Sequence, residues 1–372
     1  MREKVCIIGD GLTALMLSKA LLDLNIEIDL IIKNNFKKKL LDDRTVGISD
    51  NNLLFLKDNQ ILDKKMKNFW KIKKIKIFNS KLELDKKLLL NFENKKKDPL
   101  FHMIKNNEIY LNLKKKLEKN PLLKILIKKD NYLLSKKFLN KNYKLIINCS
   151  SNNIIDKKFF FRKIYKDYKS TAYTLIAKHS KVSNNTAYQF FTKFGPMAFL
   201  PLSENSTSIV WSVNDKNYVN NEIFKSNIRK LFPYNFKRIS FSSINKFKLN
   251  FLIPREYYFK NILTFGDGLH KIHPIAGQGF NMIIRDIKIL QTIIKNKINL
   301  GLELENSILA EFNNRVKSYN FLFAKGVDLT EEFFSNNNDI FNLYSNKFFS
   351  EIDNNNSIKS LFIKFANKGL NI

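Results

Sequence analysis

The first 32 residues follow a pattern of strand, glycine turn, helix and strand. Apolar residues dominate the segments 4–8 and 26–32, and between them residues 12–24 carry apolar side chains at helical spacing. The turn Gly9-Asp10-Gly11 joins the first strand directly to the helix. This order predicts a βαβ unit whose two strands run parallel in one sheet.

The glycine turn has the spacing Gly9-x-Gly11-x-x-Ala14. Two glycines let the backbone turn sharply and approach a pyrophosphate, whose charge is bound by backbone amides and the helix N-terminus. A purely structural turn is the alternative, and the position between strand and helix favours dinucleotide binding. The carboxylate expected after the second strand is missing, so Asn34 or Asn35 would have to bind the ribose as a neutral partner.

A second and denser motif follows an apolar strand at residues 262–265. It reads Gly266-Asp267-Gly268-Leu269-His270, and after two residues it continues as His-Pro-Ile-Ala-Gly-Gln-Gly-Phe-Asn at residues 273–281. A carboxylate at the end of a strand can accept hydrogen bonds from sugar-alcohol hydroxyls. A glycine turn that opens a helix, here residues 279–294, presents amides to an anion.

At these motifs the chain resembles the FAD-dependent aromatic hydroxylases of the para-hydroxybenzoate hydroxylase fold, and among them the ubiquinone-biosynthesis hydroxylases of the UbiH type. Residues 273–281 match the family's His-Pro-Ile-Ala-Gly-Gln-Gly-x-Asn run without a mismatch. Residues 43–49 resemble its Asp-x-Arg-x-x-Ala-x-Ser segment. Residues 191–192, 195–202 and 208–211 resemble the strands that wall the flavin ring and the substrate cavity.

The resemblance implies an FAD site built from both ends of the chain. It places the pyrophosphate at the first glycine turn, the flavin beside Arg44 and the ribityl chain at Asp267. The helix N-terminus at residues 277–281 would face the pyrimidine edge of the flavin and stabilise the negative charge of its reduced form. The expected cofactor-binding residues are Gly9, Gly11, Leu12, Thr13, Ala14, Arg44, Asp267, Pro274, Gly277, Gln278, Gly279, Phe280 and Asn281.

The chain also departs from the family pattern. Asn148-Cys149-Ser150-Ser151 stands in place of the usual Ala-Asp-Gly-x-x-Ser segment, and Gly268 and Leu269 replace two alanines. These departures bear on FAD affinity more than on the fold. The sequence names no catalytic residue and no general base.

The expected fold is α/β, with a Rossmann-like FAD-binding domain, an inserted antiparallel β-sheet substrate domain and C-terminal helices. The FAD-binding domain is expected to comprise residues 1–70, 98–154 and 255–372. The substrate domain is expected to comprise residues 71–97 and 155–254, where alternating apolar residues predict strands.

The activity implied by the resemblance is hydroxylation of the aromatic ring of a polyprenylated phenol in ubiquinone biosynthesis. NAD(P)H or another reductant would reduce the flavin, and O₂ would supply the oxygen atom. One alternative is a flavin hydroxylase of a soluble aromatic compound. Another is a non-catalytic relative that serves as a scaffold in a lipid-biosynthesis assembly. The resemblance also implies a ubiquinone-biosynthesis complex as a partner.

The formal charge of +31 raises the question of a nucleic-acid partner. The lysines are scattered along the whole chain, so we expect a solvated basic surface and no nucleic-acid site. Such a surface favours anionic lipids, and residues 357–368 are basic with one apolar face. That segment predicts either a helix packed on the core or one docked at a membrane surface.

Apolar runs, cysteines and histidines in the sequence indicate the cellular location and the metal content. No apolar run approaches the roughly 18 residues of a spanning helix, and no leader precedes the first strand. We therefore expect a cytoplasmic protein, which could also bind peripherally at the inner membrane. Cys6 and Cys149 lie at predicted strands, which argues against a disulfide framework. His270 and His273 lack a third ligand nearby, so no metal is expected.

Overall fold

The structure is a computed structural model of the 372-residue chain. It describes residues 3–33, 44–80, 87–94, 98–135, 138, 141, 143–216, 220–232, 236–274, 277–335 and 355. Asn34, Asn35, Asp43 and the segment 357–368, which carried predictions, lie outside these residues.

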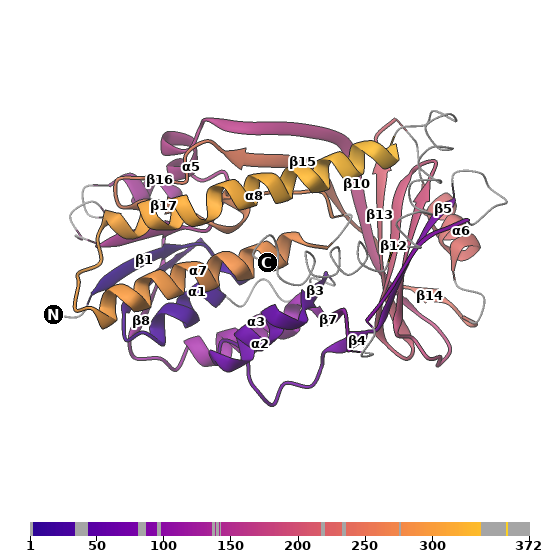
Figure 1. Cartoon of the computed structure of the whole chain (residues 1–372), viewed down its shortest axis with the longest axis horizontal. Helices are drawn as coiled ribbons and strands as arrows, with labels where there is room; N and C mark the ends of the chain where they lie inside the picture. Colours follow the sequence, from indigo (N-terminus) through magenta and orange to yellow (C-terminus); the bar gives the residue numbers. More distant parts are fainter. Residues whose placement is uncertain are drawn as a thin grey trace.

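A mostly parallel sheet forms the left half of the molecule in Figure 1. Neighbouring strands are parallel except for the antiparallel pair at one edge. Within the described residues its strand order is β16 (Tyr258–Phe259), β17 (Ile262–Thr264), β9 (Leu145–Asn148), β1 (Lys4–Ile8), β2 (Glu27–Ile32) and β8 (Leu123–Ile127). The predicted βαβ unit is therefore confirmed.

Both faces of this sheet are covered. Strand β1 alternates between two cores: Val5 and Ile7 pack into the larger cluster with the helices, and Cys6 and Ile8 pack into a smaller one. Because both faces are buried, the strand reads as a nearly continuous apolar run instead of an alternating one.

An antiparallel sheet with one parallel pair forms the right half of Figure 1. Its strands in the described part of the chain are β14 (Ser240–Phe241), β10 (Lys163–Lys178), β13 (Ser206–Asn214), β12 (Gly195–Ser203), β11 (Thr186–Thr192), β5 (Lys74–Ser80) and β6 (Lys87–Glu93), with β15 (Asn245–Pro254) paired to β10. Strand β10 is long because its first part pairs with β15 alone, and a register shift between Asp167 and Thr171 separates this part from the rest.

A small antiparallel sheet lies between the two large ones, and the sequence pattern did not indicate it. Its strands are β3 (Thr45–Ser49), β7 (Phe101–Lys105) and β4 (Trp70–Ile72). The predicted domain boundary between residues 70 and 71 falls inside β4, and the division into domains stays a prediction. The α/β fold itself, with a parallel and an antiparallel sheet, is confirmed.

The helices cover the sheets. In the described residues they are α1 (Leu12–Leu22), α2 (Asp50–Asp58), α3 (Asn106–Leu117), α5 (Ile154–Phe159), α6 (Asn221–Leu231), α7 (Gly279–Asn299) and α8 (Asn306–Ser335), with short 3₁₀ turns η2 (Asp130–Leu134) and η3 (Gly266–Gly268). Helices α7 and α8 lie side by side in front of the parallel sheet (Figure 1). No helix in the described ranges has both the length and the apolar character needed to cross a bilayer.

A buried carboxylate ties the parallel sheet together on its smaller-core face. Asp29 of β2 is buried and accepts hydrogen bonds from Tyr143 Oη at 2.5 Å and from Lys141 Nζ at 3.0 Å, and Lys4 Nζ lies at 3.2 Å. Burial opposes ionisation of Asp29, but these three donors outweigh it and hold the pKa of Asp29 below its usual value.

We predict that Asp29→Asn lowers the free energy of unfolding at pH 7 by about 1–3 kcal/mol. The folded-state pKa lies below the unfolded value, so this stabilisation is present above roughly pH 4 and is lost as pH falls through the folded pKa. Urea unfolding at pH 7 and pH 3 measures both effects, and the variant should show the weaker pH dependence. Asp130→Asn, which removes an exposed pair with Lys33, is the matched control. Equal losses in the two variants would contradict the prediction.

Candidate functional site

Three parallel strands end at the same edge of the sheet, and the chain segments that follow them lie together. Backbone hydrogen bonds continue just past the strand ends: Cys149 N donates to Ile8 O at 2.8 Å, and Phe265 N donates to Asn148 O at 2.8 Å. In open α/β sheets, ligands bind outside such carboxyl ends. The loops after β1, β9 and β17 are therefore placed to form one site.

The two glycine turns, more than 250 residues apart in the sequence, are in contact. A Cβ added to Gly266 would lie 2.7 Å from Thr13 Cγ2, and Gly266 has a φ of +63°. A Cβ added to Gly9, whose φ is +138°, would lie 3.3 Å from Cys149 Cβ. Both turns need glycine for their backbone conformation, and Gly266 also needs it for the approach of Thr13.

The N-terminus of α1 is open to an anion. Its N-cap residue, Gly11, makes no side-chain cap hydrogen bond, and the first turn contains no acidic residue. A Cβ at Gly11 would meet nothing within 4 Å. The first N–H groups of a helix have no partner within it, so the backbone of Leu12, Thr13 and Ala14 can donate to a phosphate placed there.

Asp267 presents a carboxylate beside this N-terminus. It is exposed although Gly266 and Gly268 on either side are buried, and it makes no hydrogen bond or ion pair with the residues that the structure describes. Burial raises the pKa of the Cys149 thiol, and the negative charge of Asp267 adds to the shift. Asp267 therefore lies near Cys149, which in turn contacts Gly9.

Helix α7 begins with a second uncapped N-terminus. Gly277, with a φ of +58°, donates its N–H to Pro274 O at 3.0 Å, and a Cβ there would meet nothing within 4 Å. Gln278, the N-cap residue, makes no side-chain cap hydrogen bond, and its buried Oε1 has no partner in the described part of the chain. The amides of Gly279 and Phe280 are thus also available to an anion.

The side chain of Asn281 is engaged by the protein itself. Its Oδ1 accepts from Ser49 N and from Asn52 Nδ2, both at 2.9 Å, and its Nδ2 donates to Gly47 O at 2.9 Å. Asn281 therefore fixes the start of α7 against β3, the strand that begins one residue after the exposed Arg44. Ser49 and Asn52 were not predicted as site residues, because these contacts join positions 229 and more residues apart and no local pattern reveals them.

A buried His–Asp pair joins the second motif to helices α7 and α8. His270 Nε2 lies 2.8 Å from Asp286 Oδ2, and Asn320 Nδ2 of α8 donates to Asp286 Oδ1 at 3.1 Å. His273 is also buried, and its desolvation lowers its pKa to about 3, so it is neutral at physiological pH. No group of three potential metal ligands occurs among the residues that the structure describes.

The segment that replaces the family's Ala-Asp-Gly run forms its own hydrogen-bond network. Asn148 Oδ1 accepts from Asn153 Nδ2 at 2.7 Å, and Asn153 Oδ1 caps α5 by accepting from Asp156 N at 2.9 Å. These bonds stabilise the loop after β9 without the carboxylate that the family has there.

The two faces of β13 have different surroundings. Ile209, Trp211 and Val213 pack into the core under α6, where the Trp211 ring lies 5.3 Å from the Phe224 ring. Ser208 lies on the opposite face, where its Oγ accepts a hydrogen bond from Thr45 Oγ1 of β3 at 2.9 Å. The side chain of Trp211 packs on the α6 side, and the wall of the flavin formed by the strand at residues 208–211 stays a prediction.

Comparisons with known proteins give the class of the fold. Residues 144–300 match the FAD binding domain family. The chain superposes on p-nitrophenol 4-monooxygenase from Pseudomonas putida with a TM-score of 0.78, at 11% identity over 98% of both chains. It superposes on a variant of 2-methyl-3-hydroxypyridine-5-carboxylic acid oxygenase with a TM-score of 0.69, at 12% identity over 91% of this chain and 94% of that one. The chain has the fold of the FAD-dependent aromatic monooxygenases.

In sequence the chain is similar to ubiquinone-biosynthesis hydroxylases. It is 31% identical over 159 residues to 3-demethoxyubiquinol 3-hydroxylase of Escherichia coli (strain K12), covering 41% of each protein. It is 26% identical over 221 residues to the mitochondrial ubiquinone biosynthesis monooxygenase COQ6 of Dictyostelium discoideum, covering 48% of this chain and 43% of that protein. The resemblance predicted from the motifs is confirmed, over about two fifths of these relatives' length.

We predict that Gly266→Ala destabilises the fold more than Gly301→Ala. Both positions have positive φ, +63° and +67°, so each alanine adds roughly 1–2 kcal/mol of backbone strain. Only at position 266 does the new Cβ meet a side chain, and this adds about 1–3 kcal/mol. Urea unfolding of both variants measures the difference.

A second substitution tests whether the added loss arises from Thr13. In the Gly266→Ala background, Thr13→Ala removes Cγ2 and Oγ1, the two atoms nearest to the new Cβ, and should recover part of the stability, beyond the effect of Thr13→Ala alone. Equal destabilisation of the two alanine variants, with no recovery in the double variant, would show that the two turns are not in contact.

Proposed function

We propose that the chain binds FAD at the edge where β1, β9 and β17 end. The observation that carries the proposal is the contact between the two glycine turns, which brings the N-terminus of α1 and the exposed carboxylate of Asp267 beside each other. In this proposal Gly9, Gly11 and the amides of residues 12–14 hold the pyrophosphate, and Asp267 accepts hydrogen bonds from the ribityl chain.

The flavin ring would extend from Asp267 towards the start of α7. Arg44 lies directly before β3, which Asn281 joins to α7, so it would contact the flavin from the strand side. The amides at residues 277–280 would face the pyrimidine edge, and Pro274 would shape the turn before them. Asn281 acts in this proposal as a positioning residue, since its side chain is already occupied.

We further propose that the chain is a monooxygenase of an aromatic ring. FAD supplies the redox chemistry when bound, with NAD(P)H as the electron donor and O₂ as the source of oxygen. The protein orients the substrate ring and excludes water, and the Ser208 face of β13 would form one wall of that space. The open α7 N-terminus supports negative charge at the flavin's edge.

The substrate class we propose is a polyprenylated phenol of ubiquinone biosynthesis. The similarity to ubiquinone hydroxylases from bacteria and mitochondria supports it. A ubiquinone-biosynthesis complex, peripheral binding at a membrane surface and the absence of a nucleic-acid partner stay predictions from the sequence.

We predict that Asp267→Asn weakens FAD binding by roughly tenfold to a hundredfold, because hydrogen bonds to a charged acceptor contribute about 1.5–3 kcal/mol. Titration of the FAD-free protein with FAD, followed by flavin fluorescence, measures the dissociation constant. Asp63→Asn, an exposed aspartate beside α3, is the control and should bind FAD like the unsubstituted protein. Unchanged affinity in Asp267→Asn would contradict the assigned role.

We predict that the FAD-loaded protein hydroxylates a prenylated phenol faster than the same phenol without its prenyl chain. The assay supplies NADH or NADPH and isotopically labelled O₂, and mass spectrometry detects one labelled oxygen atom in the product. Faster turnover of the unprenylated phenol would favour a soluble aromatic substrate. A colourless protein that takes up no FAD would favour the scaffold alternative.

Deletion of the gene tests the same proposal in cells. Cells without the protein should accumulate a quinone precursor that lacks one oxygen atom.

A further inference from the structure

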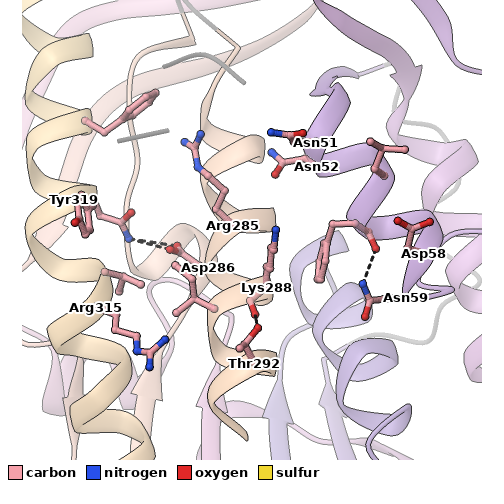
Figure 2. Close-up of a pocket in the computed structure, with 16 residues that line it drawn as sticks. Asn51, Asn52, Asp58, Asn59, Arg285, Asp286, Lys288, Thr292, Arg315 and Tyr319 are labelled. Carbon is pink, nitrogen blue, oxygen red and sulfur yellow. Dashed lines mark hydrogen bonds between the residues drawn. The ribbon is translucent and has the colours of Figure 1, made fainter. Parts of the chain in front are cut away.

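A cavity of about 660 Å³ lies between α2, α7 and α8 (Figure 2). None of the thirteen residues predicted to bind FAD is among the described residues that line it. Its volume falls within the range of small-molecule sites. The cavity is lined by cationic, polar and aromatic side chains, among them Arg285 and Lys288 of α7, Asn51 and Phe55 of α2, and Arg315 and Phe323 of α8.

Arg285 is the least satisfied group in this cavity. Its guanidinium lies over the Phe323 ring, 5.0 Å from the centroid, and its Nη1 is buried with no hydrogen-bond partner among the described residues. A guanidinium stays charged in proteins, and a buried charge is unfavourable unless it is paired. Burial lowers the pKa of Arg285, and the charge of Asp286 opposes that shift.

The neighbouring carboxylate does not supply the missing partner. Asp286 Oδ2 lies 2.8 Å from His270 Nε2, and both of its oxygens are within reach of Asn320 Nδ2, at 3.1 and 3.4 Å. The other carboxylate in the lining, Asp58, lies with Asn59 on the α2 side of the cavity, away from the guanidinium (Figure 2). The Nη1 donor of Arg285 is left for a group that enters the cavity.

A second cation of α7 lines the same cavity. In Figure 2 Arg285 extends from α7 on the side of α8, and Lys288, about one turn further along, extends on the side that faces α2. Lys288 forms no ion pair with the described residues, and its ammonium lies 5.9 Å from the centroid of the Phe55 ring. Arg315, at the other end, pairs with Glu311 at 2.7 Å and is a weaker candidate.

The lining also has an apolar part. Phe55, Ile289, Val316 and Phe323 contribute side chains to the walls beside the cationic end. A bare inorganic anion would leave this surface in water, whereas an anion attached to an organic body would cover it. Guanidinium groups bind phosphate oxygens with two parallel hydrogen bonds, and an ammonium group adds a second positive charge, so Arg285 and Lys288 suit a phosphate ligand.

We propose that the cavity between α2, α7 and α8 is a binding site for a small organic phosphate, whose phosphate group pairs with Arg285 and Lys288 and whose organic part packs on Phe55 and Phe323. A nucleotide and a short lipid phosphate share this chemistry. The lining shares no residue with the proposed FAD site, so both the FAD-loaded and the FAD-free protein should bind the ligand.

Isothermal titration calorimetry of the full chain tests the proposal with three probes: inorganic phosphate, 2′,5′-ADP and dioctanoyl phosphatidic acid. We expect at least one organic probe to bind one site per chain, more tightly than inorganic phosphate. Tighter binding of the nucleotide or of the lipid identifies the source of the phosphate. The proposal is overturned if no organic probe binds, or if inorganic phosphate binds as tightly.

Substitutions localise the binding to the cavity. Lys288→Gln, at an exposed position, should weaken binding by up to about fivefold, and Arg285→Gln by about tenfold or more. Lys295→Gln is the matched control, because Lys295 lies two turns further along the same face of α7, is exposed and is absent from the lining. Binding that Lys288→Gln leaves unchanged, or that Lys295→Gln weakens equally, would contradict the assignment even if Arg285→Gln failed to fold.

Discussion

The contact between Thr13 and the bare Cα of Gly266 is the constraint on which the rest of the site depends. It joins the turn after the first strand to the turn after β17, although they lie at opposite ends of the chain. Any side chain at position 266 would push these turns apart. With them in contact, the α1 N-terminus and Asp267 face the same space, and a pyrophosphate and a sugar alcohol can be bound by one ligand.

Helix α7 connects this space to the rest of the molecule. Its first turn is held to β3 by Asn281, its second turn carries the buried Asp286 that joins His270 to α8, and its outer side forms a wall of the α2–α7–α8 cavity. One helix thus positions groups at the proposed flavin site and at the proposed phosphate site. Buried hydrogen bonds at its start make that position rigid, because leaving any of them unpaired is unfavourable.

The sequence predicted most of the local structure and the two motifs, but not the contacts between distant parts. Residues 4–32 contain a strong apolar period, so β1, α1 and β2 were predicted nearly to their ends. Ser49 and Asn52 were missed because their partner Asn281 is more than 220 residues away. The face that Trp211 takes was also not predicted, since a strand's alternation shows two faces without showing which one packs under α6.

The structure of the protein with FAD bound, determined by crystallography, would test the central claim most directly. We predict that the pyrophosphate lies within hydrogen-bond distance of the backbone amides after Gly11, and that a ribityl hydroxyl donates to Asp267. The same structure should show Thr13 against Gly266 and the flavin ring extending towards the start of α7. FAD bound elsewhere, or an Asp267 carboxylate that contacts only solvent in the complex, would contradict the claim that the two turns form one cofactor site.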